Sequence, residues 1–299
     1  MIINFNRSHY MRHKLINLIL PLILSSFLSP FSFAAKQSNI EKESYSLGVS
    51  IGSQIQKNFK QNQIDIDADA FARGVRDILS QHKLELSSGD MSKALTQLQQ
   101  RTKQLQQQKI QLLAAEQADQ LFADRGYPSE GNENAEIIVV EFLDYQCPHC
   151  KKMKPVIRQL LESDKNIRVV YRDLPLLGPT SIEAAKVVIA ARQQGKYLDL
   201  HNALLEAKNP LSSEQIYELA EKTGIDLKKL KAEIRHPRTQ QILKNNFNLA
   251  DKLGIHATPS FIFGPSPQEK QVNKNDIFYI SGNVPYKTIE KIINQYSKQ

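Results

Sequence analysis

Two cysteines separated by two residues are the feature of this sequence with the clearest chemistry. Cys147 and Cys150 are the only cysteines in the 299 residues. A structural disulfide across so short a loop would stabilise the fold little, because the entropic gain grows with loop length. A zinc site needs four ligands, and a haem-attachment motif needs His at the position of Lys151. The pair therefore favours thiol–disulfide exchange over an inert bridge, and this chemistry requires no metal or other cofactor.

The pair lies where an apolar strand is expected to end and a helix to begin. Ile137–Leu143 is an apolar run typical of a strand buried on both faces. At the first turn of a helix, unpaired N–H groups and the positive end of the dipole lower the pKa of a thiol. We therefore expect Cys147 to be an outward-facing thiolate, with Pro148 at the first helical position and His149 adding positive charge. Cys150, one turn inward, is expected to be the resolving thiol.

The elements around the pair predict a small sheet with an inserted helical subdomain. A second strand is expected at residues 167–172, which gives a strand–helix–strand unit. Residues 179–254 are expected to form several helices in succession. A hairpin at 260–263 and 277–280 and a final helix at 284–296 complete the predicted unit.

The region before the cysteine pair predicts only helices. Apolar residues follow helical spacing over residues 45–59, and a short helix is expected at Ala68–Leu79. Ser87 and Asp90 have the spacing of a capping box. Residues 91–125 contain neither Gly nor Pro, so we expect one long helix of roughly 50 Å that acts as a solvated arm.

The N-terminus predicts export. Three basic residues precede an apolar run at residues 15–28, which is too short for a stable membrane span. Small residues before Ala35 predict cleavage after Ala34, and either Met1 or Met11 could be the true start. An uncleaved anchor is the alternative.

The charge balance gives little support to nucleic-acid binding. The chain carries 39 basic and 31 acidic residues, and removal of the leader takes away three of the basic ones. The remaining Lys and Arg are dispersed among Asp and Glu, which is typical of solvated faces. About 265 residues remain, and this length favours two structural units.

Residues 140–150, reading V-E-F-L-D-Y-Q-C-P-H-C, resemble the active-site strand and turn of the periplasmic disulfide oxidoreductases of the DsbA type. The resemblance covers about residues 136–296 and implies a thioredoxin fold. It also implies that Glu141 is a buried acid that assists proton transfer to the inner thiol. The alternative is an edge-facing Glu paired with a Lys. A buried Glu141 should have a raised pKa.

A second motif precedes the predicted hairpin, where Ala257, Thr258, Pro259 and Ser260 follow one another. The resemblance implies a cis-proline at Pro259 and a Thr258 backbone that pairs with an extended substrate. An ordinary trans proline is the alternative. Thr at this position is similar to the isomerase branch, DsbC and DsbG, whereas Pro148 and His149 indicate a strong oxidant.

The segments Y-S-L-G-V-S-I-G and F-A-R-G-V-R-D-I-L resemble the dimerisation domain of Mip and FkpA type prolyl isomerases, over about residues 38–124. The resemblance implies dimerisation without prolyl isomerase activity, because the isomerase domain is absent. A packed monomeric helical cap is the alternative. The predicted interface residues are Leu47, Ile51, Ile55, Phe71 and Val75.

Together these observations predict an α/β thioredoxin-like fold with an inserted helical subdomain, joined to an all-α N-terminal dimerisation domain by a long linker helix. The expected parts are a signal peptide at 1–34, the dimerisation domain at 36–87, the linker helix at 88–125 and the catalytic domain at 135–299, with its insert at 179–254.

The predicted function is that of a homodimeric periplasmic enzyme that forms disulfides in exported proteins and, as a second activity left open, rearranges wrong ones. Its predicted partners are unfolded or misoxidised exported proteins and a membrane redox partner, either a DsbB-like oxidase or a DsbD-like reductase. A peptide-binding chaperone or surface-associated protein that retains the fold is the alternative. The cysteine pair distinguishes the two, because only the enzyme needs Cys147.

Overall fold

The computed structural model describes residues 30–61, 64–123, 126–208, 210–266 and 272–296, with side chains from residue 38 onward. The predicted signal peptide lies almost wholly outside the described residues. The chain divides into two compact units, Met1–Gln61 and Asn62–Gln299. In the described residues, no helix is both long enough and apolar enough to cross a membrane.

The described part of the first unit is a single helix, α1 (Pro30–Gln61). It includes the predicted helical segment at residues 45–59. Several of its large apolar side chains are exposed, among them Tyr45, Leu47 and Ile51. An amphipathic helix of this kind has an apolar face that its own unit leaves uncovered.

The second unit begins with α2 (Ala68–Leu79), which has the predicted bounds. The Asp67 carboxylate caps it by accepting from the backbone N–H of Ala70 at 2.8 Å. The next helix, α3 (Ser88–Glu116), is capped by Ser87, whose hydroxyl accepts from the Asp90 N–H at 3.1 Å. Its N-terminus therefore follows the predicted cap.

The predictions of a helix reaching Arg125 and of a solvated arm are wrong at the C-terminal end of α3. The α-helix stops at Glu116 and is followed by a π-helical turn, η1 (Asp119–Ala123). Ile110 in α3 and Phe122 in η1 are buried against the sheet. The ring of Phe122 occupies the place that a Cβ atom at Gly264 would need, so glycine allows this close approach. The C-terminal end of α3 and the turn η1 are thus part of the hydrophobic core.

The sheet has five strands in the order β1-β3-β2-β4-β5. The strands β2 and β3 are parallel, whereas the other neighbouring pairs are antiparallel. Their bounds are β1 (Ser129–Gly131), β2 (Ile137–Leu143), β3 (Ile167–Asp173), β4 (Ser260–Pro265) and β5 (Phe278–Ser281). The strand β1 was not predicted, because a three-residue edge strand in a polar stretch has no apolar alternation to reveal it.

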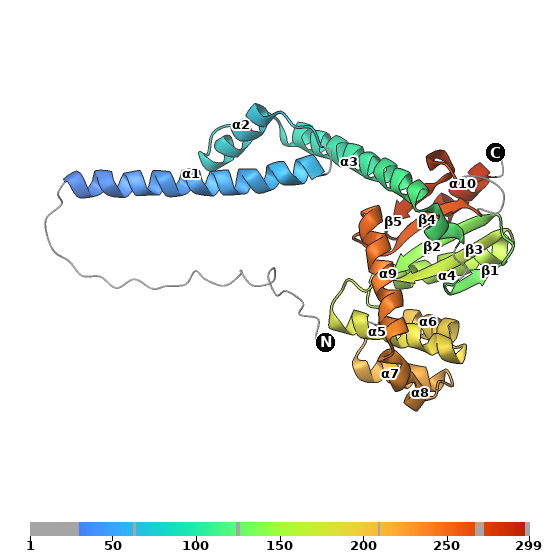
Figure 1. Cartoon of the computed structure of the whole chain (residues 1–299). Helices are drawn as coiled ribbons and strands as arrows, with labels where there is room; N and C mark the ends of the chain where they lie inside the picture. The colour runs from blue at the N-terminus through green and yellow to red at the C-terminus, as the bar shows by residue number, and fades with distance from the viewer. Residues whose placement is uncertain (1–29, 62–63, 124–125, 209, 267–271, 297–299) are drawn as a thin grey trace. The chain divides into compact units, whose positions relative to one another are not determined.

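Helices cover both faces of the sheet (Figure 1). Alternate residues of β2 point to opposite faces, so Val139 belongs to one apolar cluster and Val140 to the other. The first face is covered by α4 (Pro148–Ser163) and α10 (Tyr286–Tyr296). The same apolar cluster continues into the helical insert, which contains α5 (Pro179–Ala191), α6 (Tyr197–Glu206), α7 (Ser213–Lys222) and α8 (Leu227–Ile234).

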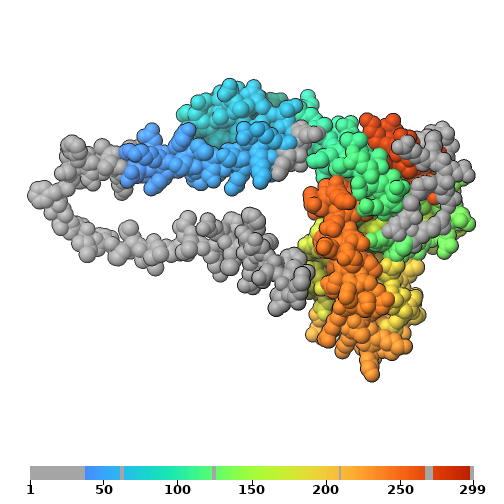
Figure 2. Space-filling model, in the orientation of Figure 1, coloured from blue at the N-terminus to red at the C-terminus, as the bar shows by residue number. Residues whose placement is uncertain are grey.

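The second face is covered by α3, η1 and α9 (Pro237–Leu253), and Figure 2 shows α3 and α9 next to one another on this side. Short 3-10 turns lie at η2 (Arg192–Gln194) and η3 (Lys274–Asp276). The central strand β2 is thus buried on both faces and ends at the cysteine pair.

Candidate active site

The cysteine pair lies at the junction of β2 and α4, as predicted. Cys147 is the N-cap residue of α4, and Pro148 occupies the first turn, where its missing N–H costs nothing. Both thiols are free, and Cys150 is 1% exposed. Cys147 is less accessible than the predicted outward-facing thiol, since only 4% of it is exposed. His149, like Pro148, lies at the surface.

Local hydrogen bonds lower the pKa of Cys147 from its ordinary value to about 5. The largest cause is a hydrogen bond from the Cys150 thiol, which outweighs the opposing effect of burial. The backbone N–H groups of Cys150 and His149 and the side chain of Thr258 also stabilise the thiolate. The first turn of α4 therefore acts as the predicted thiolate site.

The pKa of Cys150 is shifted in the opposite direction to that of Cys147. Burial, the hydrogen bond to Cys147 and the nearby Glu141 all raise its pKa above the ordinary range. The backbone N–H of Asp144 lies 3.5 Å from its sulfur and partly offsets this effect. The reduced pair thus consists of an anionic sulfur at Cys147 and a neutral inner sulfur at Cys150.

Glu141 is buried in the middle of β2, opposite Tyr171 on β3 and Phe261 on β4. This position on the central strand contradicts the alternative of an edge-facing acid. Burial, with a smaller contribution from Glu130, raises the pKa of Glu141 to about 8. At neutral pH the acid therefore carries a proton next to the inner thiol.

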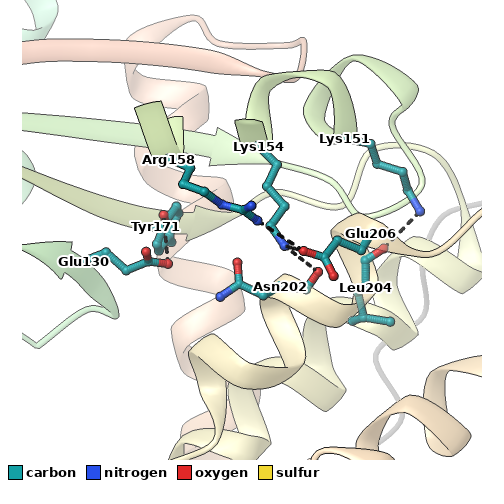
Figure 3. Close-up of polar contacts among 8 residues, drawn as sticks. All are labelled: Glu130, Lys151, Lys154, Arg158, Tyr171, Asn202, Leu204 and Glu206. Atoms are coloured by element: carbon teal, nitrogen blue, oxygen red, sulfur yellow. Dashed lines mark hydrogen bonds and ion pairs between the residues drawn. The ribbon is translucent and has the colours of Figure 1, made fainter. Parts of the chain in front are cut away.

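A cavity of about 240 Å³ reaches Glu141 from the side of α4 and α6. Figure 3 shows the polar groups on this side, where Lys154 from α4 donates to the carbonyl of Asn202 at 3.1 Å and pairs with Glu206. On β3, the Tyr171 hydroxyl donates to Glu130 at 3.3 Å. The cavity that reaches Glu141 is therefore lined by polar as well as apolar side chains.

The loop before β4 meets the active-site helix at Cys147. The Thr258–Pro259 peptide bond is cis, as the resemblance implied. The Cys147 thiol donates to the Thr258 carbonyl at 3.2 Å. The Ser260 hydroxyl donates to the carbonyl of Ala257 at 2.7 Å and closes the loop.

The predicted interface residues lie away from the cysteines in the sequence and on other helices. Leu47 and Ile51 on α1 and Phe71 and Val75 on α2 are exposed, whereas Ile55 is half-buried. They remain candidates for contact with a second chain.

Asp144 is a site residue that sequence reasoning missed. Its buried carboxylate accepts from the N–H of Gln146 at 2.9 Å through one oxygen, and from the N–H groups of Leu176 and Leu177 at 2.8 and 3.0 Å through the other. A buried acid between an apolar strand and a cysteine turn is the signal that could have identified it.

A buried hydrogen-bond network joins the active-site turn to the helical insert. The Tyr145 hydroxyl donates to Asp173 at 2.7 Å and lies 3.0 Å from Nδ1 of His201, and Tyr197 donates to the same carboxylate. Burial raises the pKa of Asp173 to about 6 and lowers that of His201 to about 3. The sequence assigns no role to His201, because its hydrogen-bond partner Tyr145 lies 56 positions earlier in the chain.

Gln146 makes a second connection to the insert. Its side-chain amide donates to the carbonyl of Leu211 and accepts from the Leu211 N–H, both at 3.0 Å. Lys151 donates to the carbonyls of Leu204 and Ala207, and burial lowers its pKa to about 8. In the residues that the structure describes, no group of three or more His, Cys, Asp or Glu is placed to hold a metal.

Comparison with solved structures relates the fold to thiol-disulfide exchange proteins. The chain is 31% identical to the thiol-disulfide exchange protein alpha-DsbA2 of Wolbachia pipientis, with a TM-score of 0.55 over 62% of this chain and 95% of that one. It is 25% identical to BcfH of Salmonella enterica Typhimurium, with a TM-score of 0.58 over 81% of this chain and 98% of that one.

Among curated proteins, the chain is 30% identical over 133 residues to a Na(+)/H(+) antiporter NhaA 3 of Salinispora tropica. This match covers 44% of the chain but only a fifth of the antiporter. Residues 40–126 match the domain amino terminal to FKBP-type peptidyl-prolyl isomerases. Residues 138–294 match the DSBA-like thioredoxin domain, and so the chain belongs to the DsbA-like family of thiol-disulfide oxidoreductases.

Proposed function

We propose that this protein oxidises thiols in exported proteins by transferring the disulfide between Cys147 and Cys150. The observation that carries the proposal is the unequal environment of the two sulfurs, with the pKa of Cys147 lowered to about 5 and that of Cys150 raised. A stabilised thiolate in the reduced form makes the oxidised form a strong oxidant. A chaperone that uses the fold only to hold peptides would not need this asymmetry.

The proposed reaction takes two electrons from a client dithiol. A client thiolate attacks the sulfur of Cys147, the bond to Cys150 breaks, and Cys150 leaves with the electron pair. Glu141, protonated at neutral pH, supplies the proton that this leaving sulfur takes up. The second client thiol loses its proton to solvent and attacks the client sulfur of the mixed disulfide, so that Cys147 leaves as the thiolate.

The extended backbone of the client is proposed to pair with Thr258 in the loop that contacts Cys147. Client pairing at a strand edge needs free main-chain groups next to the reactive sulfur. The 3.2 Å contact between the Cys147 sulfur and the Thr258 carbonyl supports this placement. Because Cys147 is only 4% exposed, the reacting client cysteine must reach it through a narrow opening.

Periplasmic location, a cleavable leader at residues 1–34 and recycling by a DsbB-like oxidase or DsbD-like reductase belong to the same proposal. The basic and apolar composition of the N-terminus supports export. Homodimerisation is supported by the match at residues 40–126 and by the exposed apolar side chains of α1 and α2. The predicted dimerisation domain at 36–87 and catalytic domain at 135–299 remain part of this proposal, whereas α3 (Ser88–Glu116) and η1 (Asp119–Ala123) replace the predicted linker helix at 88–125.

Disulfide isomerisation is the second candidate activity, supported by Thr258 and by the N-terminal unit. The reduction potential, measured against glutathione, together with repair of a scrambled disulfide protein distinguishes the two activities. We expect an oxidase to have a high reduction potential and to repair the scrambled protein poorly. An isomerase should repair the scrambled protein well, and its activity should depend on its oligomeric state. The contribution of the N-terminal helices to isomerisation cannot be measured by deleting residues 36–125. This deletion would also remove Ile110 and Phe122, which belong to the core of the second unit.

The enzyme itself is tested by the Cys147→Ala variant. We expect this variant to lose all ability to oxidise a reduced client protein. The matched variant is Cys150→Ala, which should trap mixed disulfides between Cys147 and client proteins. Retention of client oxidation by Cys147→Ala would contradict the proposal. Suppression of aggregation by both variants without any redox turnover in the wild type would support the chaperone alternative.

A further inference from the structure

The loop before β4 is held on both sides of the residue that contacts the reactive sulfur. That residue is Thr258, whose carbonyl accepts from the Cys147 thiol at 3.2 Å. On one side, the Ala257 carbonyl accepts from the Ser260 hydroxyl at 2.7 Å. On the other side, the Pro259 carbonyl accepts from the N–H of the residue that follows β5, at 2.8 Å. The orientation of the Thr258 main chain therefore depends on groups of β4 and β5 as well as on the cysteine turn.

The Ser260 hydroxyl is itself held by a tyrosine on the neighbouring strand. The hydroxyl oxygens of Ser260 and Tyr279 lie 3.2 Å apart, diagonally across the β4–β5 pair. A serine hydroxyl has one proton, and the Ala257 carbonyl accepts it, so the Tyr279 hydroxyl is the donor in this second contact. Both side chains are buried. They form a directed chain of two hydrogen bonds from β5 to the loop.

The strand β5 is held in turn by α3. Gln107 donates through its side-chain amide to the Tyr279 carbonyl at 3.3 Å, and Gln111 donates in the same way to the Ile277 carbonyl at 2.6 Å. These contacts satisfy backbone carbonyls that an edge strand otherwise leaves open. The Tyr279 side chain also belongs to the apolar cluster on this face of the sheet. Its hydroxyl is therefore a fixed point against which the loop is positioned.

We propose that Tyr279 and Ser260 are positioning residues, which hold the Thr258 main chain in the orientation that an extended client peptide needs. The proposal rests on the proposed pairing of the client with Thr258. The two hydroxyls bond to each other and to the loop, so they act on the client through the main chain. A loop that is already in its binding conformation avoids the cost of ordering on association. A loop that moves binds more weakly, in proportion to the fraction of molecules in the competent conformation.

The test compares a reduced dithiol peptide with dithiothreitol, which has no peptide backbone to pair with the loop. The variants are Tyr279→Phe and Ser260→Ala, each of which removes one hydroxyl. We expect each variant to raise KM for the peptide roughly fivefold, about the effect of one hydrogen bond, with kcat within about twofold of wild type. The rate with dithiothreitol should also stay within about twofold of wild type.

The matched control is Tyr296→Phe on α10. The Tyr296 hydroxyl donates to the Asp276 carbonyl at 2.8 Å, so this variant also loses one tyrosine hydrogen bond but leaves the loop contacts in place. The double variant Ser260→Ala/Tyr279→Phe should have the same peptide KM as Ser260→Ala, because Tyr279 acts through Ser260. A double variant whose KM is the product of the two single effects would overturn this order.

An unchanged peptide KM in Tyr279→Phe and Ser260→Ala, or an equal rise in Tyr296→Phe, would overturn the positioning role. An equal loss with dithiothreitol would also overturn it, because the effect would then lie on the sulfurs.

A peptide methylated on the backbone nitrogens beside its cysteines tests the proposed function separately, because it cannot pair as a strand. If the wild type oxidises this peptide as well as the unmethylated one, client pairing with Thr258 is contradicted. If the wild type discriminates between the two peptides and the variants match the wild type, only the positioning role is overturned.

Discussion

The sulfur of Cys147 lies 3.2 Å from the carbonyl oxygen of Thr258, 111 positions further along the chain. A carbonyl can only accept, so this contact favours the protonated thiol. The thiolate is favoured by the donors on the other side of the sulfur, above all the Cys150 thiol and the first N–H groups of α4. The loop before β4 therefore has two effects on the Cys147 proton, since the Thr258 carbonyl favours the thiol while the Thr258 side chain, like the donors of α4, favours the thiolate.

The first prediction concerns the titration of Cys147. Thiolate absorbance of the reduced protein should rise with a midpoint near pH 5, as the pKa of Cys147 indicates. Since the Cys150 thiol is the main cause, Cys150→Ala should move this midpoint upward by at least one pH unit, about the effect of one hydrogen bond to a charged group. Cys150→Ser, which keeps a donor, should move it less. Equal midpoints in the two variants would contradict the assigned cause.

The second prediction concerns Glu141 and stability. Its folded pKa of about 8 is above the unfolded value of 4.5, so its stabilising contribution is complete below pH 4.5 and is lost as the pH rises through 8. Glu141→Gln cannot ionise. Between pH 4.5 and 8 the variant should therefore gain on wild type by up to about 1.4 kcal/mol per pH unit in the free energy of unfolding.

Urea unfolding of both proteins across this pH range measures the difference between their free energies of unfolding. Cys147 titrates in both proteins, so its contribution largely cancels from this difference. Glu162→Gln, at an exposed position, serves as the control and should show no such slope. The same Glu141→Gln variant should release Cys150 more slowly from its disulfide, because the proton donor is gone. A flat stability difference would show that Glu141 ionises normally.

The third prediction concerns the network around Tyr145. Tyr145→Phe removes the donor to Asp173 and the contact with His201, and it leaves both buried groups short of one partner. Loss of a partner for a buried polar group typically costs about 1 to 3 kcal/mol. We expect a loss of that size in the free energy of unfolding, whereas Tyr286→Phe at a partly exposed position should change little.

The fourth prediction concerns the oligomeric state. Leu47→Asp/Ile51→Asp places two charges on the exposed apolar face of α1, and burying a charge in an interface is costly. We expect light scattering to give a multiple of the monomer mass for the wild type and the monomer mass for the variant. Oxidation of dithiothreitol should be unchanged, because the cysteines lie on another unit. A monomeric wild type would contradict homodimerisation.

The local sequence was sufficient to predict the strand and helix that position the cysteine pair. A largely apolar run predicted β2, helical spacing predicted α2, and the Ser87 cap predicted the start of α3, because these signals depend on neighbours within a few residues. Cys147 as the N-cap of α4 and the buried Glu141 followed from the same short stretch. The short edge strand β1 was missed, because a three-residue polar strand is defined only by its pairing with β3.

Tertiary structure alone decided which distant groups meet. The docking of α3 and η1 on the sheet depends on the fit of Phe122 against Gly264, 142 positions away, and no periodicity within the helix encodes it. Asp144 joins the cysteine turn to Leu176 and Leu177 beyond the carboxyl ends of β2 and β3. The sequence by itself thus placed a reactive cysteine pair and a buried acid at a strand–helix junction, and only packing between remote segments brought Thr258 to Cys147.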